Sequence, residues 1–358
     1  MSEVTGATPQ LLRRVNAGAV LGVMRASRVL TVSELIEATG LTRATVISVC
    51  EDLIHRGWIK EMANQRDFGG YQKGRPARRF ELNERAGFVL GLDVGASKTT
   101  VVVADLRGQT VARTSRPFRA VDISGEERIG IINAAAIAAL EAAGASARSV
   151  LAVCAGIAAP VDRNGDVMPD QHFWSHFDVG LRSALRDLHG WTVLLENDAN
   201  LAALGERWQG SAGGIDDVVV ILAGERLGSG VIEGGRLLHG RGGGAGELAY
   251  LDMVEGVGDT SGIASLARLW ASEALAGTAR TSLRQQPGDA LVNAEDVFAA
   301  AAAGDSVALG ILTRLSDRMA RIVGSVATMM NPELVVIGGA VADSAGVLLG
   351  PITKLLPG

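Results

Sequence analysis

The chain opens with two short helical patterns of apolar positions. The residues TVSE at 31–34 predict a capping box, in which Thr31 caps a helix and Glu34 reaches back to it. We expect that helix to end at Gly40, a residue suited to a left-handed C-cap. Thr42 then caps a second helix, whose buried stripe has i, i+3, i+4, i+7 spacing and consists of Val46, Val49, Cys50 and Leu53. The pattern therefore places Cys50 in a core.

Two strand patterns follow, separated by a polar, glycine-bearing loop. GWIKEM predicts one strand, and RPARRFELN predicts a returning strand in which Phe80 and Leu82 point inward. Two helices followed by such a hairpin are typical of a winged helix-turn-helix, whose second helix reads DNA. The side chains expected to contact DNA are polar or basic and are Thr42, Arg43, Thr45, Ser48, Lys73, Arg75, Arg78 and Arg79. The alternative is a module for protein contacts, with these charges on a solvated face.

From residue 87 the pattern changes to apolar strands separated by glycine-rich turns. GFVLGLDVGASKTTVVVADLRGQTVA predicts three strands, and DVVVILAGERLGSGVIEGGRLLHG repeats that layout. A later helix over about 306–330 carries apolar residues at four-residue steps, namely Val307, Ile311, Leu315 and Met319, as a core or dimer element. The expected fold is α/β: a winged helix-turn-helix at 1–85, then a duplicated two-lobed body divided into 86–200 and 201–358.

Composition and charge limit the classes of function. Residues 1–85 hold 13 Lys+Arg and 9 Asp+Glu, whereas the whole chain has a net charge of −5. A basic head on an acidic body favours a nucleic-acid reader with a separate regulatory part. Cys50 and Cys154 are too few for a disulfide framework or a zinc cluster. There is no apolar run of membrane-spanning length and no signal-peptide pattern. We therefore expect a cytoplasmic protein without a membrane partner.

Three motifs carry a resemblance to a known family. The connector KGRPARRFELNERAGFVLGLDVG, the ENDAN at 196–200 and the GGAGEL at 243–248 resemble the ROK family, which groups repressors and sugar kinases on an actin/hexokinase-like fold. In kinase members the resemblance implies that Asp198 is the general base, that Asn197 binds a sugar hydroxyl and that Glu247 accepts from hydroxyls near the anomeric carbon. Taken from the residues alone, END is equally a capping cluster at a strand-to-helix junction.

The zinc-binding pattern of the kinase members is missing. Tyr250 stands at the histidine position, and the cysteine positions align with Gly256, Gly258 and Ile263, so we expect no metal. We predict that Tyr250 either contacts the ligand or fills the space that the metal would occupy. Ser265 stands where the family has another sugar-binding glutamate.

The phosphate-binding loops also depart from the kinase pattern. In GERLGSG at 224–230, Glu225 and Arg226 replace a threonine and a glycine, and Ala96 replaces a glycine in DVGASK. A carboxylate beside a phosphate costs about 4 kcal/mol at an effective dielectric of 20. We expect neither ATP nor another cofactor, and we expect Asp198 to be a vestigial base in a protein that is not an enzyme.

These observations favour a transcriptional repressor that binds operator DNA as a homodimer or a dimer of dimers and senses a sugar or sugar-like ligand. Two alternatives remain open. One is an ATP-dependent sugar kinase with a DNA-binding head, and the other is a regulator controlled by a protein partner without a small ligand. Family members usually continue with a closing strand and helix, so the second lobe is expected to be truncated at the C-terminus.

Overall fold

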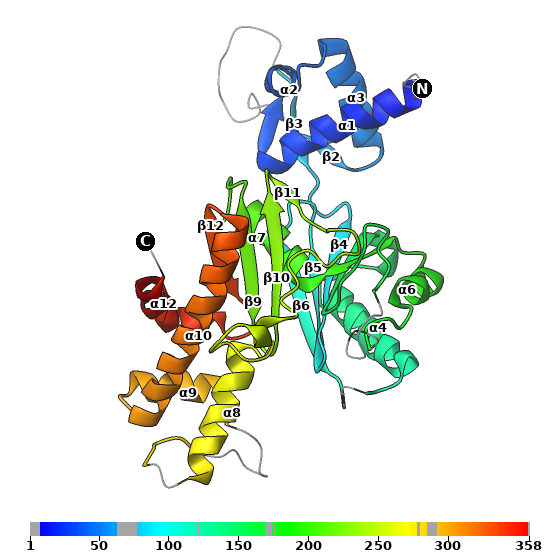
Figure 1. Cartoon of the computed structure of the whole chain (residues 1–358). Helices are drawn as coiled ribbons and strands as arrows, with labels where there is room; N and C mark the ends of the chain where they lie inside the picture. Colours follow the sequence, from blue (N-terminus) through cyan, green and yellow to red (C-terminus); the bar gives the residue numbers. More distant parts are fainter. Residues whose placement is uncertain are drawn as a thin grey trace.

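Three helices and a small sheet form the head of the molecule (Figure 1). The computed structural model describes residues 8–62, 77–120, 122–168, 174, 176–277, 280–284 and 292–356. Helix α2 (Val32–Thr39) begins with the predicted capping box and ends at Gly40, whose φ is 68°. Helix α3 (Arg43–His55) begins after Thr42, whose hydroxyl accepts from the N–H of Thr45. Both predicted caps are therefore confirmed.

A helix that the sequence interpretation did not include precedes these two. Helix α1 (Pro9–Ala26) starts after Thr8, whose side chain accepts from the N–H of Leu11, and has proline at its first position. The Thr-Pro pair was the available signal for it. Val20 and Met24 of α1 are buried against the stripe of α3, where Cys50 is fully buried as expected.

The strands of the head form a sheet with the order β1-β3-β2. They are β1 (Val29–Thr31), β2 (Ile59–Glu61) and β3 (Arg79–Leu82), and β3 runs antiparallel to both neighbours. Strands β2 and β3 are the predicted hairpin, with Phe80 and Leu82 buried. The loop that joins them, residues 63–76, lies outside the described residues.

The first lobe is a five-stranded sheet with the order β6-β5-β4-β7-β8. The predicted three-strand unit supplies its antiparallel part, and two further strands pair in parallel with it. The strands are β4 (Phe88–Val94), β5 (Lys98–Ala104), β6 (Thr110–Pro117), β7 (Val150–Ile157) and β8 (Val193–Asn197). The helical elements beside them are α4 (Gly125–Ala142), η2 (Ala147–Ser149) and α6 (Leu181–His189).

The second lobe repeats this order in a four-stranded sheet, β11-β10-β9-β12, which confirms the duplication. Its strands are β9 (Val218–Ala223), β10 (Leu227–Glu233), β11 (Arg236–Leu237) and β12 (Leu334–Gly338). Its helical elements are α7 (Asp198–Gln209), η3 (Leu251–Met253), α8 (Ile263–Ala276), α9 (Ala294–Ala302), α10 (Ser306–Met330), α11 (Ala342–Ala345), η4 (Gly346–Leu348) and α12 (Leu349–Leu355). Helix α10 is a core element, with Ile311, Leu315 and Met319 buried.

Helix α7 marks the border between the lobes. It follows β8 of the first lobe directly, but it packs on β9 and β10, where Ala203 joins the core of the second sheet. The second lobe therefore starts at Asp198, slightly before the predicted border.

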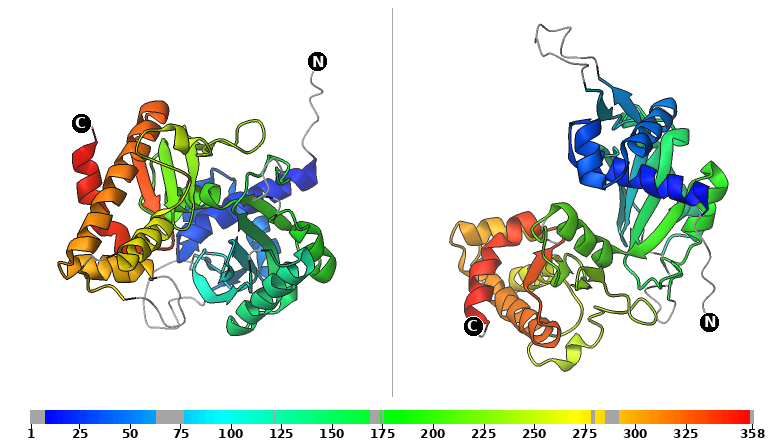
Figure 2. Two further views of the ribbon diagram at one scale, coloured as in Figure 1. Left: turned by 60° about the horizontal axis from the view of Figure 1, so that its bottom comes forward. Right: turned by 90° about the horizontal axis from the view of Figure 1, so that it is seen from above.

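Seen from above, the head overlies the first lobe and stands apart from α9 and α10 (Figure 2). Within the described segments no single helix has both the length and the apolar composition of a membrane span. Helices α9 and α10, which meet at a bend, have them only when taken together.

Candidate ligand pocket and nucleic-acid interface

A cavity of about 140 Å³ lies where the two lobes meet. Its walls come from the first lobe, from the start of α7, and from the glycine-rich segments of the second lobe. The lining residues are Ala158, Trp174, Asn197, Asp198, Leu222, Arg226, Leu227, Gly228, Glu247, Leu248, Ala249 and Thr260. The structure thus brings together three of the four predicted ligand residues, Asn197, Asp198 and Glu247.

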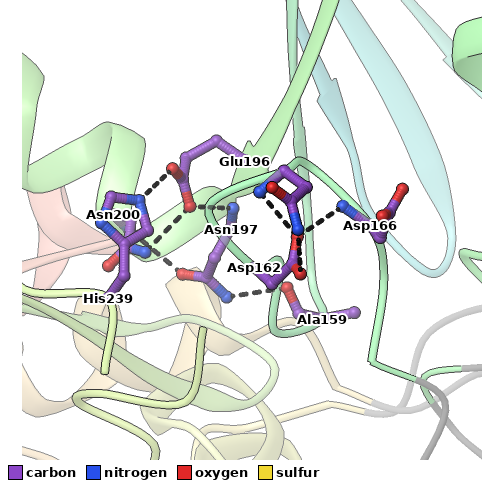
Figure 3. A network of polar contacts seen from close by, with 8 residues as sticks. Ala159, Asp162, Asp166, Glu196, Asn197, Asn200 and His239 are labelled. Carbon is purple, nitrogen blue, oxygen red and sulfur yellow. Dashed lines mark hydrogen bonds and ion pairs between the residues drawn. The ribbon is translucent and has the colours of Figure 1, made fainter. Parts of the chain in front are cut away.

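The ENDAN motif forms a polar network at the junction of β8 and α7 (Figure 3). Asn197 caps α7 by accepting from the N–H of Asn200 at 3.1 Å, and its amide donates to the carbonyl of Ala159 at 3.2 Å. Glu196 accepts from the N–H of Asn197 and the amide of Asn200, and its other oxygen contacts Nε2 of His239 at 2.8 Å. The capping alternative therefore describes Asn197 correctly, and Glu196 holds the junction of β8 and α7 in place through the same network.

Asp198 is one of the titratable residues that line the cavity. Its Oδ1 accepts from the N–H of Ala199 at 2.8 Å. Desolvation raises the pKa of this carboxyl to about 7, against the opposing effect of the Ala199 N–H, and the charges of Asp93 and Glu247 add to the rise. A carboxyl that is partly protonated at neutral pH can both donate to and accept from a hydroxyl. This suits recognition of a polyol with or without catalysis.

Glu247 reaches the cavity from a loop that depends on glycine. Gly246 has a φ of 87°, and a Cβ there would lie 2.5 Å from the carbonyl oxygen of Ser229. Only glycine allows this loop to approach β10 so closely. Although Glu247 keeps considerable solvent exposure, desolvation raises the pKa of its carboxyl, and the charge of Arg226 opposes that rise.

Arg226 is a pocket residue that the sequence interpretation missed. It was considered only as a replacement in the phosphate loop, but it lines the cavity and donates to the hydroxyl of Thr260 at 2.7 Å. The substitution of a basic residue for glycine in a ligand-facing loop was the available signal. Its guanidinium supplies a basic group among the residues that line the cavity.

Tyr250 does not lie in the cavity. Its side chain is 77% exposed, so it neither lines the ligand site nor fills the space of a missing metal. The next residue, Leu251, takes the buried position in the core of the second lobe instead. Among the described residues no three His, Cys, Asp or Glu side chains gather into a potential metal site. The expectation that the protein uses no metal stays a prediction.

The loop at the phosphate position of the kinase members, residues 224–230, is tied to the segment before α8. The N–H of Gly262 donates to the carbonyl of Glu225 at 2.8 Å, and a Cβ on Gly262 would lie 2.0 Å from the carbonyl oxygen of Gly224. The Glu225 carboxylate forms an ion pair with Arg268, with one N···O distance of 2.9 Å. This ion pair offsets part of the repulsion expected for a phosphate, so the prediction that ATP is not bound depends mainly on the bulk and backbone of the loop.

The predicted DNA face lies at the start of α3. Thr42, Arg43 and Ser48 are exposed there, and Thr45 is half-buried with its hydroxyl 2.9 Å from that of Thr42. Arg79 at the start of β3 is half-buried as well. The positions Lys73 and Arg75 fall outside the described residues.

Arg78 has a different environment from the one expected. Its guanidinium donates to both carboxylate oxygens of Glu61 at 2.8 and 2.9 Å, and to Glu51 at 3.2 Å. The bidentate pair with Glu61 joins the two strands at the base of the wing, and the single bond to Glu51 ties that base to α3. The structure therefore favours a bracing role for Arg78 over a phosphate contact.

Known proteins resemble this chain in both sequence and structure. The model of the ROK family matches residues 89–357. The xylose repressor of Caldicellulosiruptor bescii is 23% identical over 343 residues, which cover 92% of this chain and 84% of that protein. A solved ROK family transcriptional regulator, a homolog of the Escherichia coli MLC protein, has a TM-score of 0.74 at 23% identity and covers 96% of this chain and 88% of its own.

A solved ROK family glucokinase from Streptomyces griseus, in complex with glucose and AMPPNP, resembles the body alone. It has a TM-score of 0.62 at 27% identity and covers 75% of this chain and 88% of its own. Regulators thus match the head and the body together. Because the family model matches well over half of the residues, this chain belongs to the ROK family.

Proposed function

We propose that the protein is a transcriptional repressor that binds operator DNA through its winged helix-turn-helix and responds to a sugar or sugar-like ligand. One observation carries the proposal: a helix-turn-helix with a strand hairpin is joined to a body in which Asn197, Asp198 and Glu247 line one cavity. Regulators among its relatives match both parts of the chain, which supports the same reading. The protein then uses neither metal nor nucleotide, and Asp198 binds rather than catalyses.

A DNA reader of this kind acts as a dimer. Two heads bind two half-sites about one helical turn apart, so a ligand that changes the arrangement of the lobes changes the match between heads and DNA. We therefore propose a homodimer as the functional unit, with α3 of each copy in the major groove.

Arg226 adds a second ligand class to neutral sugars. Its guanidinium lines the same cavity as Asp198 and Glu247, and guanidinium groups bind carboxylates and phosphates in bidentate geometry. Sugar acids and sugar phosphates are therefore candidates beside neutral monosaccharides. A Glu247→Ala variant should weaken binding of either class, whereas Arg226→Gln should weaken binding of the anionic class selectively.

The proposal is tested in two steps. Thermal shift against neutral monosaccharides, sugar acids and sugar phosphates identifies a ligand, with Glu247→Ala as the pocket variant and the exposed Tyr250→Phe as the matched control. Selection from a random duplex library then identifies an operator. A ligand-induced thermal shift that is lost in Glu247→Ala and kept in Tyr250→Phe supports the proposed ligand pocket. Failure of the selection to enrich any duplex would contradict the proposal of a repressor.

The alternatives give different outcomes in the same experiments. Sugar-dependent hydrolysis of ATP that disappears in Asp198→Asn would favour the kinase. If the selection identifies an operator but no small molecule changes the melting temperature, control by a partner protein is favoured.

A further inference from the structure

The head rests on a turn of the first lobe. The turn between β5 and β6 places Arg107 under the C-terminal end of α1, where its Nη1 donates to the carbonyls of Arg25 and Ser27 at 2.9 Å. Its Nε donates to Glu84 of the connector at 3.0 Å. Because the last carbonyls of a helix lack partners within it, a guanidinium at this position joins α1 firmly to the lobe.

The second lobe reaches the same place through Trp208, in the last turn of α7. Its indole lies so close to Gly108 that a Cβ there would be 2.3 Å from Cη2, and Gly108 has a φ of 84°. The guanidinium carbon of Arg25, on α1, lies 5.3 Å from the centroid of the ring. Trp208 therefore contacts both the turn that carries the head and the head itself.

The other end of α7 forms a wall of the ligand cavity. The helix begins at Asp198, and its cap Asn197 also lines the cavity. Helix α7 packs closely on the second sheet, since a Cβ on Gly230 of β10 would lie 2.3 Å from the carbonyl oxygen of Ala199. Its 12 residues span about 18 Å as a rigid rod. A movement of one end is therefore passed to the other.

We propose that α7 couples the ligand cavity to the DNA-binding head, with the contact of Trp208 on Arg25 and Gly108 as the point of transfer. The inference rests on the proposed function, because it requires both a ligand and an operator. A ligand that closes the lobes around Asp198 moves α7 together with the second sheet, while Arg107 keeps α1 on the first lobe. The Trp208 contact is thus favoured in one arrangement of the lobes, and the position of the head follows the ligand.

The test compares ligand and DNA binding in four variants. Trp208→Ala and Arg25→Gln remove the contact, Trp208→Phe retains an aromatic ring, and Arg28→Gln is the matched control on an exposed arginine of the head. The sugar and the operator identified above serve as probes. Fluorescence anisotropy gives the affinity for the duplex with and without the sugar, and thermal shift gives the affinity for the sugar.

We expect the wild type to show a ligand-dependent change in DNA affinity within the usual range of about 5- to 150-fold. In Trp208→Ala and Arg25→Gln that change should fall below about twofold, while each ligand alone still binds as in the wild type. Trp208→Phe should recover part of the change, and Arg28→Gln should keep all of it. Full coupling in Trp208→Ala would overturn the inference.

A failure of the proposed function gives a different pattern. If no sugar changes the melting temperature of the wild type, the ligand proposal fails. The operator alone then serves as the probe of the Trp208 contact. Coupling is reciprocal, so DNA binding should then change the exposure of Trp208. The measurement is the acrylamide quenching of Trp208 fluorescence, which is the part of the wild-type signal that is absent in Trp208→Phe. Unchanged quenching overturns the coupling, and absence of any DNA binding overturns both proposals.

Discussion

Replacing Asp198 with asparagine should stabilise the protein at neutral and alkaline pH. Desolvation holds the pKa of this carboxyl at about 7, against an ordinary value of 3.8 for aspartate. Between about pH 4 and pH 7 the folded protein keeps a proton that the unfolded chain has released, so stability falls as the pH rises through this window. Above pH 7 both states are ionised and the loss is complete.

The size of the effect follows from the two pKa values. A difference of about three pKa units corresponds to a cost of about 4 kcal/mol, which is an upper bound because the cavity admits water. Of this, about 2–3 kcal/mol accumulates between pH 5 and pH 8. Asparagine keeps the oxygen that accepts from the N–H of Ala199 and carries no charge. The variant should therefore lose this part of the pH dependence.

Thermal melts at several pH values give the measurement. At about 2–4 °C per kcal/mol for a unit of 150–250 residues, Asp198→Asn should melt about 5–10 °C above the wild type at pH 8. The difference should shrink steadily toward pH 5. Asp343→Asn, which changes an exposed carboxylate on helix α11, is the matched control and should follow the wild type. A melting difference that does not change with pH would refute the assignment of this cost to the Asp198 carboxyl.

Three further substitutions test other parts of the structure. Gly262→Ala should destabilise the second lobe by about 1–3 kcal/mol in thermal melts, because its Cβ would lie 2.0 Å from the carbonyl oxygen of Gly224; an unchanged melting point would contradict the close packing. Arg107→Met should leave carbonyls of α1 without a donor and speed proteolysis between the head and the body, and an unchanged cleavage rate would argue against its role. Arg43→Gln should weaken operator binding and reduce the salt slope by about 1, while Arg56→Gln, whose arginine pairs with Asp52, should not.

Local patterns in the sequence were sufficient for most elements. The capping box at Thr31, the cap at Thr42 and the apolar stripe of α3 depend on residues within one or two turns, so spacing alone predicts them. The repeated strands of the two lobes were equally readable, because alternation and glycine turns are local as well. Helix α1 was missed although the same kind of signal, Thr8 before Pro9, was present.

The roles of individual site residues depended on tertiary structure. Arg78 braces the wing because Glu51 and Glu61 approach it from α3 and β2. Arg226 lines the cavity, where its guanidinium donates to the hydroxyl of Thr260. Tyr250 was placed in the site by its position in a motif, yet the neighbouring Leu251 is the residue that the core buries.

The contacts at the junction of the head, the first lobe and the second lobe were not predicted from the sequence at all. They join Arg25, Arg107 and Trp208, which are separated by about 80 and 100 positions along the chain. A sequence determines which stretches become helices and strands through short-range hydrogen bonding and periodic burial. Which side chains then meet is decided when distant elements pack, because contact between them depends on the geometry of both sheets and not on spacing along the chain.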